Sequence, residues 1–369
     1  DLTNALKTRV STTAALVTTG GKFYASAFRS PVDAASIIFL RNGQLYELSG
    51  GQVTQNLITQ VKALAAALND RLGLAPGDRI EIDSNDLFLA LSGLSPADWY
   101  SFKSVIANLV SIDQALTNLM TFVATFNAQR AGDPPGGKIE LSNSRLFLTA
   151  LTMNEQARKN AADPAGMKLW LNQLRSLADT LTPADIADKD RITNTSIFRL
   201  MLSMDDGAKE NIANAARFIQ DFNRISTLAT ELHVVLTLNE RFGDAVALSK
   251  DARENLADAQ RFKAEFNTLG AIGVQFSIKM TGAEQFHLTL RLNTQNRANL
   301  ANVAQLRIYY DKMRAAAGAD FSVFELFSVA LSLTAEQRIN LDNSDFAANI
   351  DQILTLAVRT TGLVLPRKQ

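Results

Sequence analysis

One spacing recurs five times along the chain and constrains its fold more than any other feature. Each copy has a phenylalanine, an asparagine 13 positions later, and a base two positions before that asparagine. The phenylalanines lie 51, 44, 44 and 41 residues apart, which is the spacing of internal repeats. The five pairs are Phe147 and Asn160, Phe198 and Asn211, Phe242 and Asn255, Phe286 and Asn299, and Phe327 and Asn340. The five bases are Arg158, Lys209, Arg253, Arg297 and Arg338. A divergent copy starts at Phe88, where Ser101 replaces the asparagine.

The residues that follow each phenylalanine predict a β-strand. From residue 286 to residue 292, apolar and polar side chains alternate, which is the period of a half-buried strand. The apolar positions are Phe286, Leu288, Leu290 and Leu292, and the polar positions are His287, Thr289 and Arg291. A second short alternating run precedes most of the phenylalanines, and turn-forming residues separate the two runs. Each pair of runs therefore predicts a β-hairpin, and Asn42-Gly43 suits the type I′ turn of the first one.

Residues with a helical period follow each hairpin. In residues 249–270, Ser249 is predicted to cap a helix and Gly270 to end it. The apolar stripe of this helix consists of Leu256, Ala259, Phe262, Phe266 and Leu269. Such a stripe must lie against the apolar face of a sheet.

The predicted fold class is therefore α+β, with about seven units that each contain a hairpin and a helix. One unit cannot bury its own stripe, so stacked units are expected to form an extended or curved antiparallel sheet with helices on one face. The predicted hairpins lie near residues 35–49, 80–94, 138–152, 191–204, 233–249, 273–293 and 320–333.

The same pattern predicts three regions. Residues 1–34 form a β-prone N-terminal extension, residues 35–137 contain divergent repeats, and residues 138–369 contain the regular array. Residues 131–138, with two prolines and three glycines, resemble a linker, although a long turn is the preferred interpretation. The array is expected to finish in an edge strand that Pro366 stops.

Composition excludes several classes of protein and chemistry. The chain of 369 residues has 37 bases and 37 acids, so no net charge would attract nucleic acid. No run of apolar residues is long enough to predict a transmembrane segment. Cysteine is absent, which removes disulfides, thiolate nucleophiles and thiolate metal ligands. Together with a first residue other than methionine, this favours an extracytoplasmic or cell-surface location.

No motif in the sequence predicts a catalytic, cofactor or metal site. The two histidines, His233 and His287, have no second histidine or cysteine at ligand spacing, so we expect neither to act as a ligand or a base. The acidic pairs Asp205-Asp206 and residues 83–86 fit helix capping better than calcium binding. Nucleotide-binding glycine motifs and the serine nucleophile motif are missing. We therefore expect no enzyme activity and no cofactor.

The repeated base and asparagine allow two interpretations. Five bases in a row could form a track for a polyanion, but Glu155, Glu210, Glu254 and Glu336 lie beside them and cancel the charge. The preferred interpretation is structural: each asparagine satisfies backbone groups between successive units, and each base pairs with its neighbouring acid. The phenylalanines are expected in the core rather than as stacking platforms for bases or sugars.

Small side chains on the predicted outer strand face suggest a function. This face would carry Ser328, Ala330 and Ser332 in one copy and Gly243, Ala245 and Ala247 in another. Small residues suit close contact with another surface. With residues 8–28 as a strand-donating extension, they lead to the hypothesis of a structural, self-assembling homo-oligomer or polymer of a surface layer, filament or shell. The alternatives are a monomeric scaffold that binds a protein or polysaccharide, and an enzyme such as a carbohydrate-active hydrolase, whose two carboxylates would be far apart in sequence but close together in a cleft.

Overall fold

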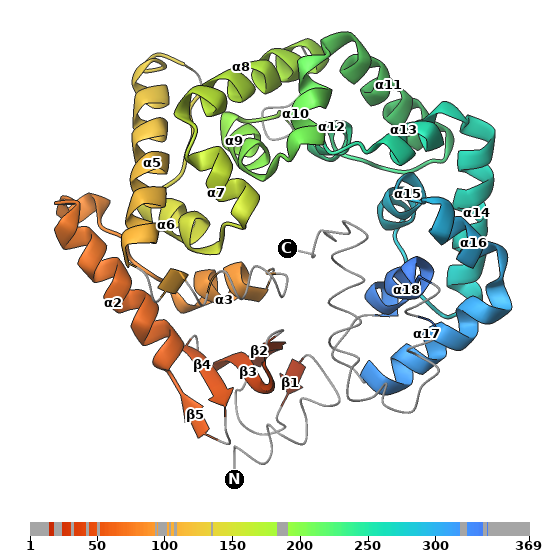
Figure 1. Ribbon diagram of the computed structural model, residues 1–369, viewed down its shortest axis with the longest axis horizontal. Helices are drawn as coiled ribbons and strands as arrows, with labels where there is room; N and C mark the ends of the chain where they lie inside the picture. The colour runs from red at the N-terminus through yellow and green to blue at the C-terminus, as the bar shows by residue number, and fades with distance from the viewer. Residues whose placement is uncertain are drawn as a thin grey trace. The chain divides into compact units, whose positions relative to one another are not determined.

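A computed structural model shows a mostly helical protein with one small sheet (Figure 1). It describes residues 15–17, 24–30, 33–41, 44–49, 52–92, 94, 102, 105–106, 109–133, 136–182, 191–317, 323–334 and 338. Two compact units are present. The first contains residues 1–113, 143–152 and 298–369, and the second contains residues 114–142 and 153–297.

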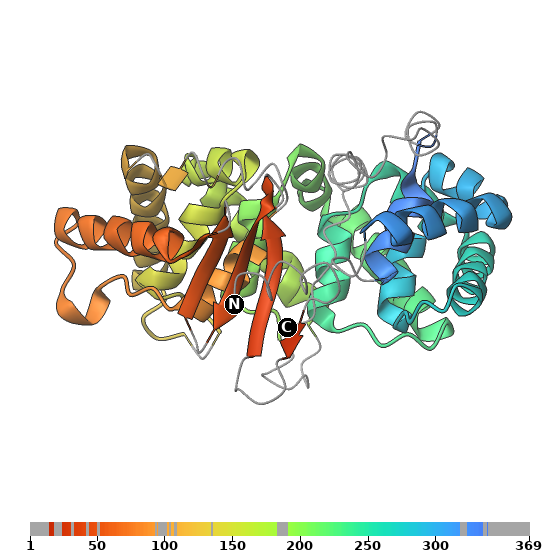
Figure 2. The same ribbon diagram turned by 90° about the horizontal axis from the view of Figure 1, so that it is seen from below.

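The first unit contains the sheet. Its five strands are antiparallel and lie in chain order (Figure 2). They are β1 Ala15–Val17, β2 Tyr24–Ser30, β3 Asp33–Arg41, β4 Gln44–Ser49 and β5 Gln52–Thr54. β3 and β4 pair from Arg41 with Gln44 to Ile37 with Leu48, so a hairpin occupies the first predicted position. Its turn, Asn42-Gly43, lies outside the described residues, as does the predicted C-terminal edge strand.

Helices make up the rest of the described chain. The early ones are α2 Asn56–Arg71, the 3-10 turn η1 Pro76–Asp78, α3 Ser84–Ser92 and α5 Leu109–Ala128. The later ones are α6 Asn143–Thr152, α7 Glu155–Ala161, α8 Pro164–Leu181, α9 Asn194–Ser203, α10 Asp206–Ala213, α11 Ala215–Glu231, α12 Leu238–Val246, α13 Lys250–Ala257, α14 Ala259–Gln275, α15 Gly282–Leu290, α16 Thr294–Ala301, α17 Val303–Ala317 and α18 Val323–Ser332. In the first unit, α2 packs against β4, and α3 contacts both β3 and β4.

The predicted α+β array of hairpins is wrong. Six of the seven predicted hairpins contain helices instead: α3, α6, α9, α12, α15 and α18. In α15, Phe286, Leu288, Thr289 and Leu290 are all buried. A short helix that is buried on several sides carries apolar residues at two-residue spacing as readily as a strand does. The alternation therefore did not identify a strand.

The repeat is a triplet of helices. A first helix carries the phenylalanine, a short second helix carries the asparagine, and a longer third helix follows, as in α9–α10–α11 and α12–α13–α14 of the second unit. The helix predicted at residues 249–270 is two helices, because Asp258 ends α13 and caps α14. Gly270 does not end a helix. It lies inside α14, where a Cβ would clash with the side chain of Gln285 at 2.7 Å.

Contacts in the second unit link each triplet to the next. The phenylalanine helix packs on the long helix of the preceding triplet, in the pairs α8 with α9, α11 with α12 and α14 with α15. It also packs on the preceding asparagine helix, in the pairs α7 with α9, α10 with α12 and α13 with α15. Figure 1 shows this succession from α8 to α15. Each triplet therefore completes the core of its neighbour, as in other repeat proteins.

Side-chain caps define where the helices start. Thr193, Thr237 and Thr281 cap the phenylalanine helices α9, α12 and α15, and the last two form capping boxes with Glu240 and Glu284. The second helices α7, α10 and α13 begin after Asn154, Asp205 and Ser249. The third helices α8, α11 and α14 begin after Asp163, Asn214 and Asp258. These caps satisfy amide groups that would otherwise lack partners at every helix start.

Loss of one capping box is expected to destabilise the fold moderately. Thr281→Ala removes the acceptor for the Glu284 amide, at 3.2 Å, and a donor to the Glu284 carboxylate, at 2.9 Å. The free energy of unfolding should fall by about 1 kcal/mol, measured by urea denaturation. Thr268→Ala, in the middle of α14 and exposed, is the control, because alanine suits a helix interior at least as well. Equal stability of the two variants would contradict the prediction.

One described helix meets the length and apolarity of a membrane span. It is α5, and 28% of its apolar window is buried. Its buried residues recur at helical spacing, at Ile112, Leu116, Leu119, Val123 and Phe126. The core helix of a globular protein passes the same test, so α5 is weak evidence for a membrane span and agrees with the expectation of no transmembrane segment.

Candidate functional site

The repeated asparagines lie buried at the joints between triplets. Asn160, Asn211, Asn255 and Asn299 are at most 5% exposed. Each Nδ2 donates hydrogen bonds to carbonyls at the end of the next phenylalanine helix. Asn255 bonds to Leu290 O at 3.0 Å and to Leu292 O at 2.7 Å. The matching acceptors are Leu202 and Met204 for Asn160, Val246 and Leu248 for Asn211, and Leu331 and Leu333 for Asn299.

These bonds give the asparagine a structural role. The last carbonyls of a helix have no partner within that helix. The amide of one triplet thus completes the end of a helix in the next triplet, at the same two positions each time. Asn340 lies outside the described residues. The phenylalanines are core residues, since all five are at most 1% exposed. The Phe262 and Phe286 rings, for example, lie 5.0 Å apart.

The bases also connect triplets, but through other acids than the neighbouring glutamates. Arg253 Nε donates to the Asp221 carboxylate at 3.0 Å, and Arg253 Nη2 donates to Asn211 Oδ1. Arg297 makes the same two contacts, with Glu265 at 2.6 Å and with Asn255. The acceptor acids Asp221 and Glu265 each lie 23 residues after the phenylalanine of the preceding triplet. Each guanidinium therefore binds the long helix and the asparagine of the triplet before it.

The partner changes where the base is lysine. Lys209 lies 4.4 Å from the centre of the Trp170 ring, and Trp170 occupies the position of Asp221 and Glu265 in its own triplet. A cation–π contact thus replaces the ion pair. The glutamates beside the bases make other contacts. Glu155 pairs with Lys159 at 2.8 Å, and this hydrogen bond lowers the pKa of Glu155. Glu210 pairs with Arg217 at 3.5 Å, and Glu336 lies outside the described residues.

The two histidines have different environments. His287 Nε2 lies 2.9 Å from Asp244 Oδ2, and both side chains are largely buried between α12 and α15. His233 adopts a positive φ of 55° after the last turn of α11, where its amide hydrogen-bonds to Thr230 O. The described residues hold no cluster of three or more metal-binding side chains. The sequence could not show the His287–Asp244 pair, because its members lie 43 residues apart.

The acidic stretches act as helix caps. Asp205 accepts the Ala208 amide at 2.8 Å. Asp83 accepts the amides of Asn85 and Asp86 at the start of α3. Both stretches therefore have a structural explanation.

The small residues assigned to an outer sheet face lie in helices. Ser328, Ala330 and Ser332 of α18 are 2%, 1% and 6% exposed, and Ala245 of α12 is 1% exposed. Close helix packing explains small side chains at these positions. The outer sheet face inferred from them is therefore wrong.

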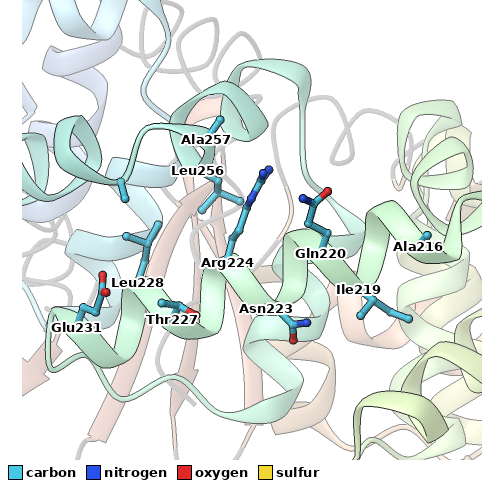
Figure 3. Close-up of a pocket in the computed structure, with 11 residues that line it drawn as sticks. Ala216, Ile219, Gln220, Asn223, Arg224, Thr227, Leu228, Glu231, Leu256 and Ala257 are labelled. Atoms are coloured by element: carbon cyan, nitrogen blue, oxygen red, sulfur yellow. The ribbon is translucent and has the colours of Figure 1, made fainter.

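A groove of ≈ 590 Å³ lies on the second unit, between α11 and the corner where α13 meets α14 (Figure 3). The α11 wall presents amides, a hydroxyl and two charged side chains, and the opposite wall is apolar and small. The α11 wall consists of Ala216, Ile219, Gln220, Asn223, Arg224, Thr227, Leu228 and Glu231, and the other wall of Leu256, Ala257 and Ala259. In Figure 3 the Arg224 side chain extends from α11 towards Leu256. Residue order alone does not reveal this groove, because its walls belong to two triplets.

Comparisons with known proteins identify no relative. No family model matches the chain, and neither a curated protein nor a solved structure is significantly similar to it.

Proposed function

We propose that this protein is a non-enzymatic helical-repeat scaffold that binds another protein. The observation that carries the proposal is that the repeated side chains have structural roles, while a groove beside them stays accessible. Phenylalanine, asparagine and base are buried or paired at the joints between triplets, whereas the groove on α11 is left open. Stacked repeats with an open surface typically present it to a partner.

The nature of the exposed surface favours a protein over a polysaccharide. A sugar-binding scaffold is expected to expose a patch of aromatic rings. Among the aromatic residues whose burial the structure describes, every phenylalanine, tyrosine and tryptophan is buried or half-buried. The groove instead offers amide and hydroxyl groups beside small apolar residues, which suits a polypeptide.

Self-assembly, the leading hypothesis from the sequence, becomes the second candidate; the absence of net charge, which opposes association only weakly, still favours it. The small-residue surface no longer supports it. A surface-layer or filament subunit would also be extracytoplasmic, whereas the scaffold function does not require a particular location. A mass measurement separates the two candidates.

The scaffold function predicts a monomer that binds peptides with defined stoichiometry. Sedimentation of the full chain, across a wide range of concentrations, should give one monomeric species. A display library of random peptides, selected on the same chain, should yield sequences with a shared pattern that bind at one peptide per chain in calorimetry. A failure to enrich any pattern, together with concentration-dependent growth into large regular species, would replace the scaffold with self-assembly.

A further inference from the structure

The exposed face of the long helices carries the same kinds of side chain in successive triplets. Among the described residues, three of the six exposed large apolar side chains occupy one repeat position, 22 residues after the phenylalanine. They are Val110, Leu169 and Ile308, with exposures of 65%, 56% and 48%. Gln220 and Ala264 hold this position in the other two triplets, and both are exposed. Recurrence at one position indicates a surface feature of the repeat rather than a scattered apolar residue.

An exposed asparagine follows three residues later in three triplets. Asn172, Asn223 and Asn267 lie near the middle of α8, α11 and α14. No hydrogen bond joins these amides to another residue of the described chain. Asparagine favours a helix interior less than most residues, so helix stability does not explain its presence there. Each amide keeps its donors and its acceptor for a ligand, and a peptide bond needs one of each.

One position in the opposite wall of the groove is small in four triplets. Ala257 and Ala259 line the groove across from α11, together with Leu256. The position of Ala257 is alanine in four triplets, at Ala162, Ala213, Ala257 and Ala301, and all four are exposed. Short side chains keep the wall low, so a backbone can approach the α11 amides closely.

Charge selects the ligand. Arg224 Nη1 lies 3.9 Å from Asp221, but that carboxylate already accepts the closer bond from Arg253 at 3.0 Å. At the other end of the groove, Glu231 pairs with Lys263 at 2.8 Å. The groove lining carries one cation and one anion; Glu231 is closely paired, whereas Arg224 is 41% exposed and shares Asp221 with a closer cation. A ligand with a carboxylate at this point would complement Arg224.

The length of the groove fits a short extended segment. The α11 wall runs from Ala216 to Glu231, a helical span of about 22 Å. An extended chain advances about 3.3 Å per residue, so about seven residues would fill the groove. A strand can bond its backbone to the amides of Gln220 and Asn223, both of which line the groove.

We propose that this groove binds an extended, acidic segment of a partner polypeptide, with its backbone on Asn223 and a carboxylate on Arg224. The inference rests on the scaffold function proposed above. Nucleic acid fits less well because the groove lining carries one cation and one anion and has no aromatic ring for stacking.

The test uses two peptide display libraries selected on the full chain. In one library the charged positions are aspartate or glutamate, and in the other they are lysine or arginine. The acidic library should yield binders whose affinity falls about tenfold with Arg224→Glu, since an attraction becomes a repulsion. Arg224→Glu should in turn select from the basic library. Asn223→Ala should also weaken the acidic binders, while Arg199→Glu, on the exposed face of α9, should leave them unchanged.

The outcomes separate the groove from the scaffold function. Binders that tolerate Arg224→Glu and Asn223→Ala as well as Arg199→Glu would overturn the groove while keeping a scaffold that binds elsewhere. A failure of both libraries to yield binders would overturn the groove and the scaffold function together. Circular dichroism of each variant shows whether the helices remain. If Arg224→Glu loses helix, the milder variant Arg224→Gln takes its place in the same selection.

Discussion

Asn255→Ala is expected to lower the free energy of unfolding by about 3 kcal/mol, although it removes only a few atoms. The side chain is fully buried and donates to Leu290 O and Leu292 O. It also accepts a hydrogen bond from Arg297. Alanine leaves two buried carbonyls without donors and a guanidinium without one acceptor. A buried polar group without a hydrogen-bond partner destabilises the fold by more than the net free energy of the hydrogen bond that was lost.

Asn267→Ala is the matched control, since it removes the same amide from an exposed position on the adjacent helix α14. Its effect should stay within about 0.5 kcal/mol. Asn255→Asp separates the effect of losing the hydrogen-bond donors from the effect of losing side-chain volume. The aspartate has nearly the same volume, but its carboxylate would place an oxygen against both carbonyls. It should also be destabilising. Urea denaturation gives the free energies, and amide hydrogen exchange should locate the weakening at the joint between α13 and α15. Comparable stability of Asn255→Ala and Asn267→Ala would remove the structural role of the repeated asparagine.

The sequence predicted the repeat but not the structure of its first element. The spacing from Phe286 to Asn299 depends only on residue order, so it could be found without knowing whether a helix or a strand follows the phenylalanine. The alternation from Phe286 to Leu292 favoured a strand because every second residue is apolar. Burial on several sides of α15 gives the same pattern. Tertiary packing, which one sequence does not reveal, decided between the two.

A local signal for the correct element was present. Thr281 and Glu284 have the spacing of a capping box, and Thr237 and Glu240 repeat it one triplet earlier. Both pairs lie within predicted hairpins, at residues 273–293 and 233–249, so no helix start was expected there. Asp258 was missed as a cap for a related reason: it interrupts the helical stripe without a proline or glycine to mark the break. The region boundaries 1–34, 35–137 and 138–369 stay predictions.

The candidate groove depends on contacts that residue order does not contain. Arg224 lies on α11 and Ala257 on α13, so the two walls come from successive triplets. Their recurrence could have been found by aligning every repeat position, since Asn172, Asn223 and Asn267 are in register. The ion pairs show the same limit. Glu210 and Glu254 directly follow Lys209 and Arg253, but both glutamates are exposed, because successive side chains on a helix point 100° apart.

Arg253→Met tests that choice of partner directly and is expected to lower the free energy of unfolding by about 3 kcal/mol. Methionine preserves much of the stem of the side chain but leaves Asp221, which is 3% exposed, without its closest cation. A buried carboxylate without its partner is strongly destabilising, and the more distant Arg224 at 3.9 Å offsets only part of the loss. Removal of the carboxylate as well, in Arg253→Met with Asp221→Asn, should restore much of the stability.

Glu254→Gln is the control, because it removes the acid that sequence order places next to Arg253. Its side chain is exposed, so the free energy of unfolding should change by less than about 0.5 kcal/mol. Urea denaturation of the four proteins forms a double-mutant cycle for Arg253 and Asp221, with Glu254→Gln beside it. A large effect of Glu254→Gln, with no coupling between Arg253 and Asp221, would show that Arg253 interacts with Glu254 instead of Asp221. Strong coupling to Asp221 would instead show that the repeated base binds one triplet to the previous one, as Arg297 and Glu265 do again 44 residues later.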